Sequence, residues 1–276
     1  MEENSNIQLN NFVFIIPVKQ SNNISDKDSC VRCIKSIRKF YQDTKIIIIN
    51  DSAHSIASDS DLKNFFNDEN IIVTHCEVEG SGNAYALNYF YNNNIGEYAI
   101  ILHDSTELIK KFSPFNFDIK FFWYFVAHHI WNRVSVPQPN NLIKTHEDEI
   151  LNFYKNLKYS KFKDDFIRSY YNKLSWKGCF GTMFVISKNF LNLLEEKTSI
   201  LSLTQHVKSR RDRMCMESIM GVAVFYTKKF DIKDEYSYSL QGQWEKAVEN
   251  AFRVGIRCNQ TNSIIGEYIG KFSLGR

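Results

Sequence analysis

The chain has 276 residues, of which 43% are hydrophobic and 24% are charged, and its formal net charge is +3. This length and composition are enough to bury a substantial core, as one large domain or as a domain with an appended segment. The small net charge argues against a nucleic-acid partner or an anionic membrane, and no apolar run reaches the roughly 20 residues that a membrane-spanning helix needs. Because the amino terminus also lacks a signal-peptide pattern, we expect a cytoplasmic protein.

Three short apolar runs in the first part of the chain each end on polar residues. They cover residues 12–19 (FVFIIPVK), 45–52 (KIIIINDS) and 98–105 (YAIILHDS). A run rich in β-branched residues predicts a fully buried parallel strand, and its carboxyl end lies at the edge where open α/β sheets bind ligands. The second and third runs therefore place Asp51 and Asp104 at such an edge.

Helical patterns alternate with these strands. Apolar residues recur at helical spacing in residues 30–41, 61–66 and 80–94, and residues 71–78 predict one more strand. Strands that alternate with helices in this way are typical of an α/β fold with a parallel sheet. We therefore expect a mixed α/β sheet flanked by helices.

The pattern is less regular beyond residue 105. Residues 120–134 are dense in aromatic side chains and predict either a buried strand followed by a turn or an amphipathic helix. Further along, we expect a helix that begins at residue 146, a strand at residues 182–186 and a helix that begins at residue 216.

Six cysteines are spread through the chain, at positions 30, 33, 76, 179, 215 and 258. Most of them fall within or beside predicted helices and strands, so we interpret them as reduced thiols. Cys30 and Cys33 form a C-x-x-C, but no second pair follows at zinc spacing, which argues against a zinc site there.

The order of these motifs resembles that of family 2-type nucleotide-sugar glycosyltransferases, which have the GT-A fold. The first strand ends I-I-P-V, the second ends I-I-N-D-S, a helix begins G-x-x-x-A-L-N, and the next strand ends in an acidic motif. The match covers about the first 110 residues and resumes more loosely at WKGCFG and RMCMESIMG. The resemblance implies a GT-A-like (Rossmann-like) sheet. It also implies transfer of a sugar from a nucleotide sugar, most commonly a UDP-sugar, to an acceptor hydroxyl with inversion.

Asp51 is the candidate for nucleoside binding. A carboxylate at a strand end can accept hydrogen bonds from the base imide or the ribose hydroxyls of a nucleotide. The alternative is an aspartate that caps the turn after the strand. The resemblance adds Pro17, Val18 and Lys19, at the end of the first strand, as a wall of the same pocket.

Gly82 begins the helix that follows the third strand. Glycine permits a close backbone approach, and the free N–H groups of a helix start suit a phosphate or a ribose, but a simple turn into a helix would explain it equally well. Asn88 matches an asparagine that is common in the family, although on a helix face it could instead bond only to backbone.

The triplet of His103, Asp104 and Ser105 occupies the position of the family's metal motif. Metal-using GT-A enzymes commonly carry Asp-x-Asp there, which holds Mn²⁺ or Mg²⁺ against the diphosphate, and oxygen ligands suit these cations. The resemblance therefore implies a divalent metal on Asp104, with His103 as a plausible Mn²⁺ ligand. This chain departs from the pattern because the triplet holds a single carboxylate. Glu107 could contribute a second.

The catalytic base in similar enzymes comes from an acidic motif late in the domain. The segment E-S-I-M-G resembles the family's E-x-x-x-G, so Glu217 is the first candidate and Asp212 the second. Glu217 could instead be a solvated helix acid paired with Arg213 at i, i+4. Arg210, Arg211 and Arg213 could grip the diphosphate, or form a solvated face.

A glycine-containing loop at WKGCFG corresponds to the family's donor-sugar pocket. Trp176 could stack on a sugar ring and Gly181 could leave room for it, but a tryptophan buried beside a turn is the competing explanation. His128 and His129 flank the aromatic run, as a third metal ligand or as core residues.

Taken with the resemblance, the sequence indicates one continuous domain in three parts. These are a nucleotide-binding α/β half (1–110), an acceptor and donor-sugar half (111–230) and a C-terminal extension (231–276) that packs on or closes over the site. The acceptor would be a glycan, a lipid-linked molecule or a protein, and a homo-oligomer is compatible with the aromatic run. Two rivals remain: a non-catalytic nucleotide- or sugar-binding member of the fold, and another nucleotide-dependent enzyme such as a nucleotidyltransferase.

Overall fold

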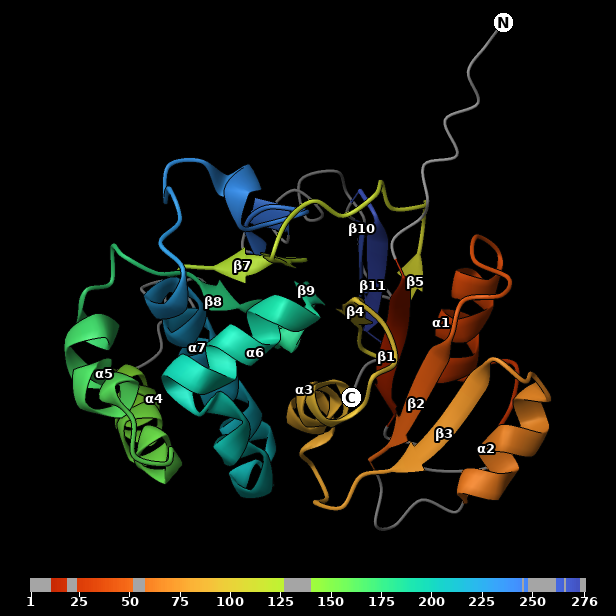
Figure 1. Ribbon diagram of the computed structural model, residues 1–276, viewed down its shortest axis with the longest axis horizontal. Coiled ribbons are helices and arrows are strands. Elements are labelled where there is room, and N and C mark those ends of the chain that lie inside the picture. The colour runs from red at the N-terminus through yellow and green to blue at the C-terminus, as the bar shows by residue number, and fades with distance from the viewer. Residues whose placement is uncertain are drawn as a thin grey trace, which may run out of the picture.

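The structure of the chain is a computed structural model (Figure 1). It describes residues 11–18, 24–51, 58–126, 140–244, 246–247, 262–265 and 267–273. Lys19, His128 and His129 lie outside the described residues.

The first part of the chain alternates strands and helices, as predicted. Its elements are β1 (Phe12–Val18), α1 (Ser29–Arg38), β2 (Ile46–Asn50), α2 (Asp59–Phe66), β3 (Ile71–His75), α3 (Gly82–Asn92) and β4 (Tyr98–Ile101). β5 (Thr106–Leu108) follows directly after the His-Asp-Ser triplet.

The second part adds helices and short strands. They are β6 (Ile119–Phe121), β7 (Tyr124–Phe125), α4 (Asn140–Phe153), α5 (Lys161–Tyr171), β8 (Gly178–Cys179), β9 (Phe184–Ser187), α6 (Lys188–Thr198), α7 (Arg210–Thr227), β10 (Asn262–Ile265) and β11 (Ile269–Ser273). Four 3₁₀ helices complete the described chain: Tyr154–Asn156, Phe180–Thr182, Ile200–His206 and Glu235–Ser237. The described part of the aromatic run, residues 120–126, thus contributes strands. This agrees with its interpretation as a buried strand followed by a turn.

Within the described residues, six strands form one mixed sheet in the order β3-β2-β1-β4-β9-β6. Strands β1 to β4 are parallel, whereas β9 runs antiparallel to both β4 and β6. The expected α/β sheet flanked by helices is therefore confirmed. Because parallel strands end at the same edge, the residues that follow β1, β2 and β4 converge there.

Helices cover both faces of this sheet. Val13 and Ile15 of β1 belong to a core that includes residues of α3, α6 and α7, whereas Phe14 and Ile16 belong to a second core that includes α1. Figure 1 shows α1 and α2 on one side of the parallel strands, and α3, α6 and α7 on the other. Burial on both faces explains why these strands are continuous apolar runs without alternation.

Helix α7 begins earlier than the sequence analysis expected. Ser209 caps it: the Ser209 hydroxyl accepts the backbone N–H of Asp212, and the Asp212 carboxylate accepts the backbone N–H of Ser209 in return. This capping box brings Arg210 and Arg213 into the first turn. The basic run is therefore the start of the helix.

A small second sheet joins the C-terminal segment to the site. β11 pairs antiparallel with β10 on one side and with β5 on the other. In this register Lys271 lies opposite Thr106, next to the triplet that follows β4.

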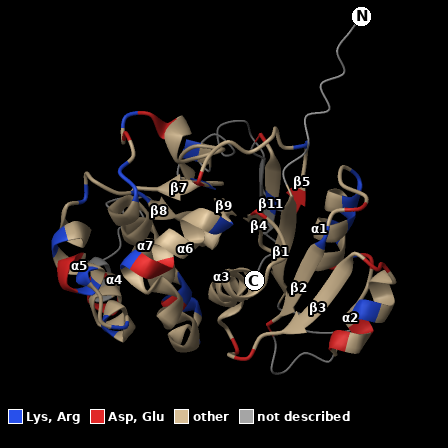
Figure 2. Cartoon of the chain, in the orientation of Figure 1, with Lys and Arg blue, Asp and Glu red and all other residues tan. Residues whose placement is uncertain are grey.

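The charged residues are mixed in sign on the outer helices, and the described cysteines are reduced. Figure 2 shows Lys and Arg interspersed with Asp and Glu over the outer helices α2, α4 and α5. Five of the six cysteines fall within the described residues, and all five are buried free thiols. No helix among the described residues combines the length and the apolar character that crossing a membrane requires.

Candidate functional site

A cavity of about 220 Å³ lies at the carboxyl edge of the parallel strands. The strand ends, the start of α3 and helix α7 line it, through Pro17, Asp51, Asn83, His103, Asp104, Ser105, Arg213 and Glu217. The ends of β1, β2 and β4 thus meet at one site, together with an acid and a cation from α7. Open α/β sheets bind their ligands in this position.

Asp51 is held by the turn that leads into α3. One carboxylate oxygen accepts the N–H of Gly80 at 2.8 Å, and the other accepts the N–H of Gly82 at 3.1 Å. The side chain is 6% exposed; burial raises its pKa, while the two N–H groups and Arg213 lower it. Asp51 therefore organises the α3 start, as the capping alternative requires, and it also lines the cavity.

Gly82 is required by close packing at this point. A Cβ atom there would lie 2.8 Å from Oδ2 of Asp51 and 2.9 Å from Cβ of Pro17. Contacts below 3.0 Å force a neighbour to shift. Only glycine lets the α3 start approach the ends of β1 and β2 this closely.

His103 has both ring nitrogens engaged. Nε2 lies 2.6 Å from the carbonyl oxygen of Gly181, and Nδ1 lies 2.9 Å from the ammonium of Lys271. Because a carbonyl only accepts and an ammonium only donates, we assign the proton to Nε2 and the lone pair to Nδ1. The amide nitrogen of Asn83 lies 2.7 Å from Nε2, and in this assignment its N–H groups serve the Gly181 carbonyl and Thr182 Oγ1 instead. Burial, together with the charges of Lys271 and Arg213, holds the pKa of His103 well below its usual value, so the ring is neutral.

Gly181 forms the turn against which His103 rests. Its φ is +66°, and a Cβ atom there would lie 2.8 Å from Cε1 of His103. Its carbonyl also accepts the side-chain amide of Asn83 at 2.7 Å, and this amide donates to Thr182 Oγ1 at 2.8 Å. The turn before β9 is thus tied to both β4 and α3.

Lys271 enters the site from β11. Its Nζ donates to His103 Nδ1 and, at 3.1 Å, to the Ser105 hydroxyl. Burial lowers the pKa of Lys271 to about 8, and the charges of Asp104 and Glu217 oppose this shift.

The residues of the predicted metal site do not fit a divalent ion in this arrangement. A histidine ligand must offer a ring lone pair, but the lone pair on Nδ1 is directed at an ammonium and Nε2 carries a proton. Asp104 remains the single carboxylate of the triplet, and Glu107 is not among the residues that line the cavity; its carboxylate pairs with Arg32 at 3.7 Å. The metal stays a prediction, while the structure places the Lys271 ammonium beside His103 and Ser105 of the triplet.

Glu217 and Arg213 bring opposite charges to the same cavity from α7. Burial raises the pKa of Glu217 to about 8, whereas the N–H of Gly181 and the cations Lys271, Arg213 and Arg210 act in the opposite direction. Arg213 also donates from Nη1 to the carbonyl of Gly80 at 3.3 Å. Glu217 is therefore the one acid of its helix that faces the cavity.

Several predicted site residues lie elsewhere. Asp212 does not line the cavity, because its carboxylate forms the α7 capping box. Trp176 is 2% exposed, and its indole N–H donates to the carbonyl of Tyr170, which agrees with the interpretation as a core residue. Asn88 accepts from Asn92 on the α3 surface, and Val18 is a buried core residue beside Pro17.

Sequence reasoning missed Lys271 and Asn83. Lys271 lies in a segment of weak periodicity, 168 residues from its partner His103. Asn83 follows Gly82 directly, so its place in the first turn of a helix at the ligand edge was a usable signal.

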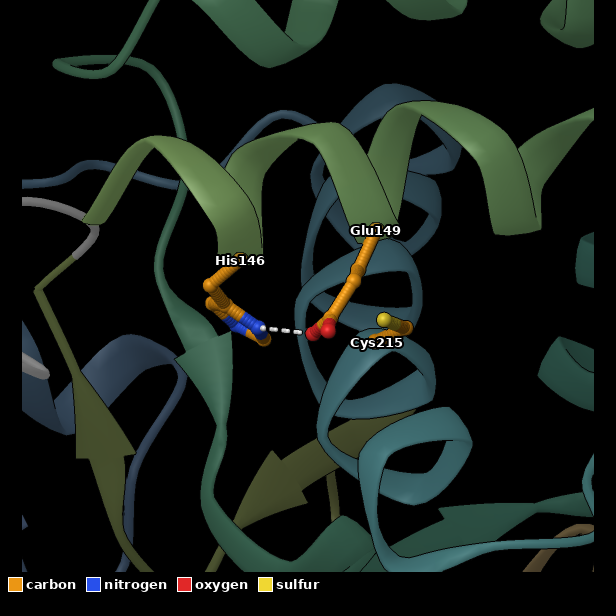
Figure 3. Close-up of side chains that lie close together, drawn as sticks. All are labelled: His146, Glu149 and Cys215. Carbon is orange, nitrogen blue, oxygen red and sulfur yellow. Dashed lines mark hydrogen bonds and ion pairs between the residues drawn. The ribbon is translucent and has the colours of Figure 1, made fainter. Parts of the chain in front are cut away.

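A second group of side chains that could hold a metal lies outside the cavity. Figure 3 shows His146 and Glu149 on α4 facing Cys215 on α7, and their ligand atoms all lie within 4.8 Å of one another. His146 Nδ1 is 3.5 Å from Glu149 Oε2, and Arg211 donates to Glu149 Oε1 at 2.7 Å. Burial raises the pKa of Cys215 to about 12, so the thiol keeps its proton at neutral pH. The ion pair between Arg211 and Glu149 joins α7 to α4, and we interpret His146 and Cys215 as packing residues beside it.

Comparison with protein-family models and with curated proteins gives no match. Comparison with solved structures gives matches to S. aureus TarS. A crystal structure of TarS 1–349 matches at 12% identity and a TM-score of 0.39, over 75% of this chain and 54% of that one. The UDP and UDP-GlcNAc complexes of TarS 1–349 each match at 17% identity, with TM-scores of 0.28 and 0.26, over 36% and 35% of this chain and 29% and 27% of theirs.

The chain therefore spans about half or less of each of these TarS chains. Every TM-score is below 0.5, so these matches do not define an activity.

The contact between Gly181 and His103 can be tested against a matched glycine. Gly242 also has a positive φ, +82°, but a Cβ atom there would come no closer than 3.9 Å to Glu235. We expect Gly242→Ala to lose about 1–2 kcal/mol of unfolding free energy from backbone strain alone. Gly181→Ala should lose about 1–3 kcal/mol more, because the new methyl group presses on His103. Urea unfolding measures both losses, and equal losses would show that the His103 contact carries no strain.

Proposed function

We propose that the chain is a nucleotide-sugar glycosyltransferase that transfers a sugar from a UDP-sugar to an acceptor hydroxyl with inversion. One observation carries the proposal: the ends of β1, β2 and β4 meet Glu217 and Arg213 in a single cavity. This combination offers a carboxylate for a nucleoside, a cation for a diphosphate and an acid of raised pKa for proton transfer. The acceptor is a glycan, a lipid-linked molecule or a protein.

The nucleotide would lie across the carboxyl edge of the sheet. Asp51 and Pro17 line the end of the cavity formed by β1 and β2, and Asp51 retains further lone pairs beyond the two that accept N–H groups. Arg213 would bind the diphosphate through guanidinium N–H groups other than the one that donates to Gly80.

Glu217 would be the base. In an inverting transfer, the acceptor oxygen forms a bond to the anomeric carbon as the bond to the diphosphate breaks, and the acceptor proton passes to the base. The nucleoside diphosphate leaves with the electron pair of the broken bond. Arg213 would stabilise the negative charge that develops on it.

Asp51→Asn tests nucleoside binding. Loss of the carboxylate charge should weaken UDP binding about tenfold or more, as expected for a charge-assisted hydrogen bond. Pyrophosphate binding should change little, because pyrophosphate has no nucleoside. Calorimetric titration measures the dissociation constants of both ligands for the variant and the wild type.

The matched control for this prediction is Asp59→Asn. Asp59 accepts from the side-chain amide of Asn50 but does not line the cavity, so its loss should leave UDP binding unchanged. Equal losses of UDP and pyrophosphate binding in Asp51→Asn would mean that Asp51 only supports the turn before α3.

Glu217→Gln tests the base. The amide keeps the shape of the side chain but cannot take a proton, so turnover should fall about 100-fold or more while UDP binding stays within about twofold. A screen of nucleotide sugars for transfer and hydrolysis, together with UDP titration, measures both quantities. Glu195→Gln is the control: Glu195 is also a partly buried glutamate with a raised pKa, but it accepts from Leu201 outside the cavity.

Three outcomes would count against this part of the proposal. Near-normal turnover of Glu217→Gln would assign the base to another acid. Nucleotide binding by the wild-type chain without any turnover would favour a non-catalytic member of the fold. If the wild-type chain binds none of the common nucleoside diphosphates, nucleotide binding is rejected altogether.

The raised pKa of Glu217 predicts a pH dependence. Only the deprotonated carboxylate accepts a proton, and burial raises its pKa to about 8. We therefore expect kcat/KM to rise from about pH 6 to about pH 8. A pH series on the wild-type chain measures this limb, which Glu217→Gln should lack, and a flat profile over the range would contradict the assignment.

A further inference from the structure

The cation nearest to the His103-Asp104-Ser105 triplet is supplied by the chain itself. The Lys271 ammonium donates to His103 Nδ1 at 2.9 Å and to the Ser105 hydroxyl at 3.1 Å. Both distances suit hydrogen bonds donated by an ammonium. A positive charge therefore already stands among the groups that sequence analysis assigned to a metal.

The position of Lys271 is set by backbone pairing. β11 pairs with β5 so that Lys271 lies opposite Thr106, and the Thr106 hydroxyl donates to the carbonyl of His103 at 2.6 Å. At the start of β11, the side-chain carbonyl of Gln241 accepts the N–H groups of Tyr268 and Ile269 at 3.0 and 3.1 Å. The strand that carries Lys271 is thus held in place by β5 and by the side chain of Gln241.

A divalent ion and the Lys271 ammonium would compete for the same groups, His103 and Asp104. An ion bound to His103 would need the lone pair on Nδ1, which points at the ammonium, because Nε2–H donates to the Gly181 carbonyl. An ion beside Asp104 would also be repelled by the ammonium, because the charges of Asp104 and Lys271 interact and like charges repel strongly in a partly buried site.

We propose that the Lys271 ammonium replaces a divalent metal in this site, so that the chain binds the diphosphate of its nucleotide without a metal ion. An ammonium has three N–H donors; His103 and Ser105 take two, and the third serves a phosphate oxygen. Lys271 and Arg213 then supply two positive charges to the diphosphate from opposite parts of the chain. The proposal rests on the proposed function for the identity of the ligand.

The test compares UDP binding with and without a metal. Calorimetric titration of the wild-type chain in EDTA and in Mn²⁺ should give dissociation constants within about twofold of each other. In EDTA, Lys271→Met keeps most of the apolar stem but loses the charge, and should weaken UDP and pyrophosphate binding about tenfold or more. Lys271→Arg should restore part of this loss because it restores a charged donor.

Lys110→Met is the matched control. Lys110 lies just after β5 and pairs with Glu267 just before β11, so this variant removes a lysine of the same strand pair whose partner is Glu267 and not His103 or Ser105. Its binding should equal that of the wild type, and thermal unfolding of all three variants reports whether the strand pair is intact. A Lys271→Met variant that binds as tightly as the wild type in EDTA would overturn the proposal.

Direct measurement of Mn²⁺ separates this proposal from the proposed function. The electron paramagnetic resonance signal of free Mn²⁺ should persist when the wild-type chain is added without nucleotide. Loss of this signal in the wild type, but not in Asp104→Asn, would overturn the replacement of the metal by Lys271, whatever the nucleotide does.

The remaining outcomes are also decisive. UDP binding that requires Mn²⁺ would overturn the proposal and leave the glycosyltransferase assignment standing. If UDP binds under neither condition, the proposed function fails. In that case two results together would still support the lysine as the cation of the site. These are Mn²⁺ that stays free in the presence of the chain, and pyrophosphate binding that is lost in Lys271→Met.

Discussion

The site depends on the two hydrogen bonds of a single imidazole. His103 donates from Nε2 to the carbonyl of Gly181 and accepts at Nδ1 from Lys271, so one ring joins the end of β4, the turn before β9 and the C-terminal strand β11. The turn can meet the ring only because Gly181 has a positive φ and no side chain. The N–H of Gly181 in turn lowers the pKa of Glu217, so α7 is coupled to the same point.

The charges of Glu217 and Lys271 modify each other. Burial alone disfavours the charged forms of Glu217 and Lys271, raising the pKa of the first and lowering that of the second. Each charge offsets part of this cost for the other, and Arg213 adds to the effect on Glu217. The protonation states of Glu217 and Lys271 are therefore coupled to each other.

Local sequence was sufficient to predict the strands and helices up to β4, because strands buried on both faces are continuous apolar runs and the helices between them have clear apolar spacing. It also placed Asp51 and Asp104 at the ligand edge, since that follows from strand direction. It could not reveal Lys271, whose role depends on pairing between β5 and β11. For Trp176, the loop sequence allowed either a sugar platform or a core residue, and only the packing against Tyr170 shows its burial. Ser209 and Asp212 have the spacing of a capping box, which predicts the start of α7, but Asp212 was interpreted as a candidate catalytic base.

The long sequence separation between His103 and Lys271 has a consequence for the order of folding. The β1-to-β4 unit forms from contacts separated by a few tens of residues, whereas the ammonium reaches the imidazole across 168 residues. Closing the longer loop costs only about 1–2 kcal/mol more in chain entropy, but contacts of high sequence separation slow folding. The acidic edge of the sheet should therefore form first and stand without its lysine for a time. Docking of β11 then brings the Lys271 ammonium to His103 and Ser105 and completes the site.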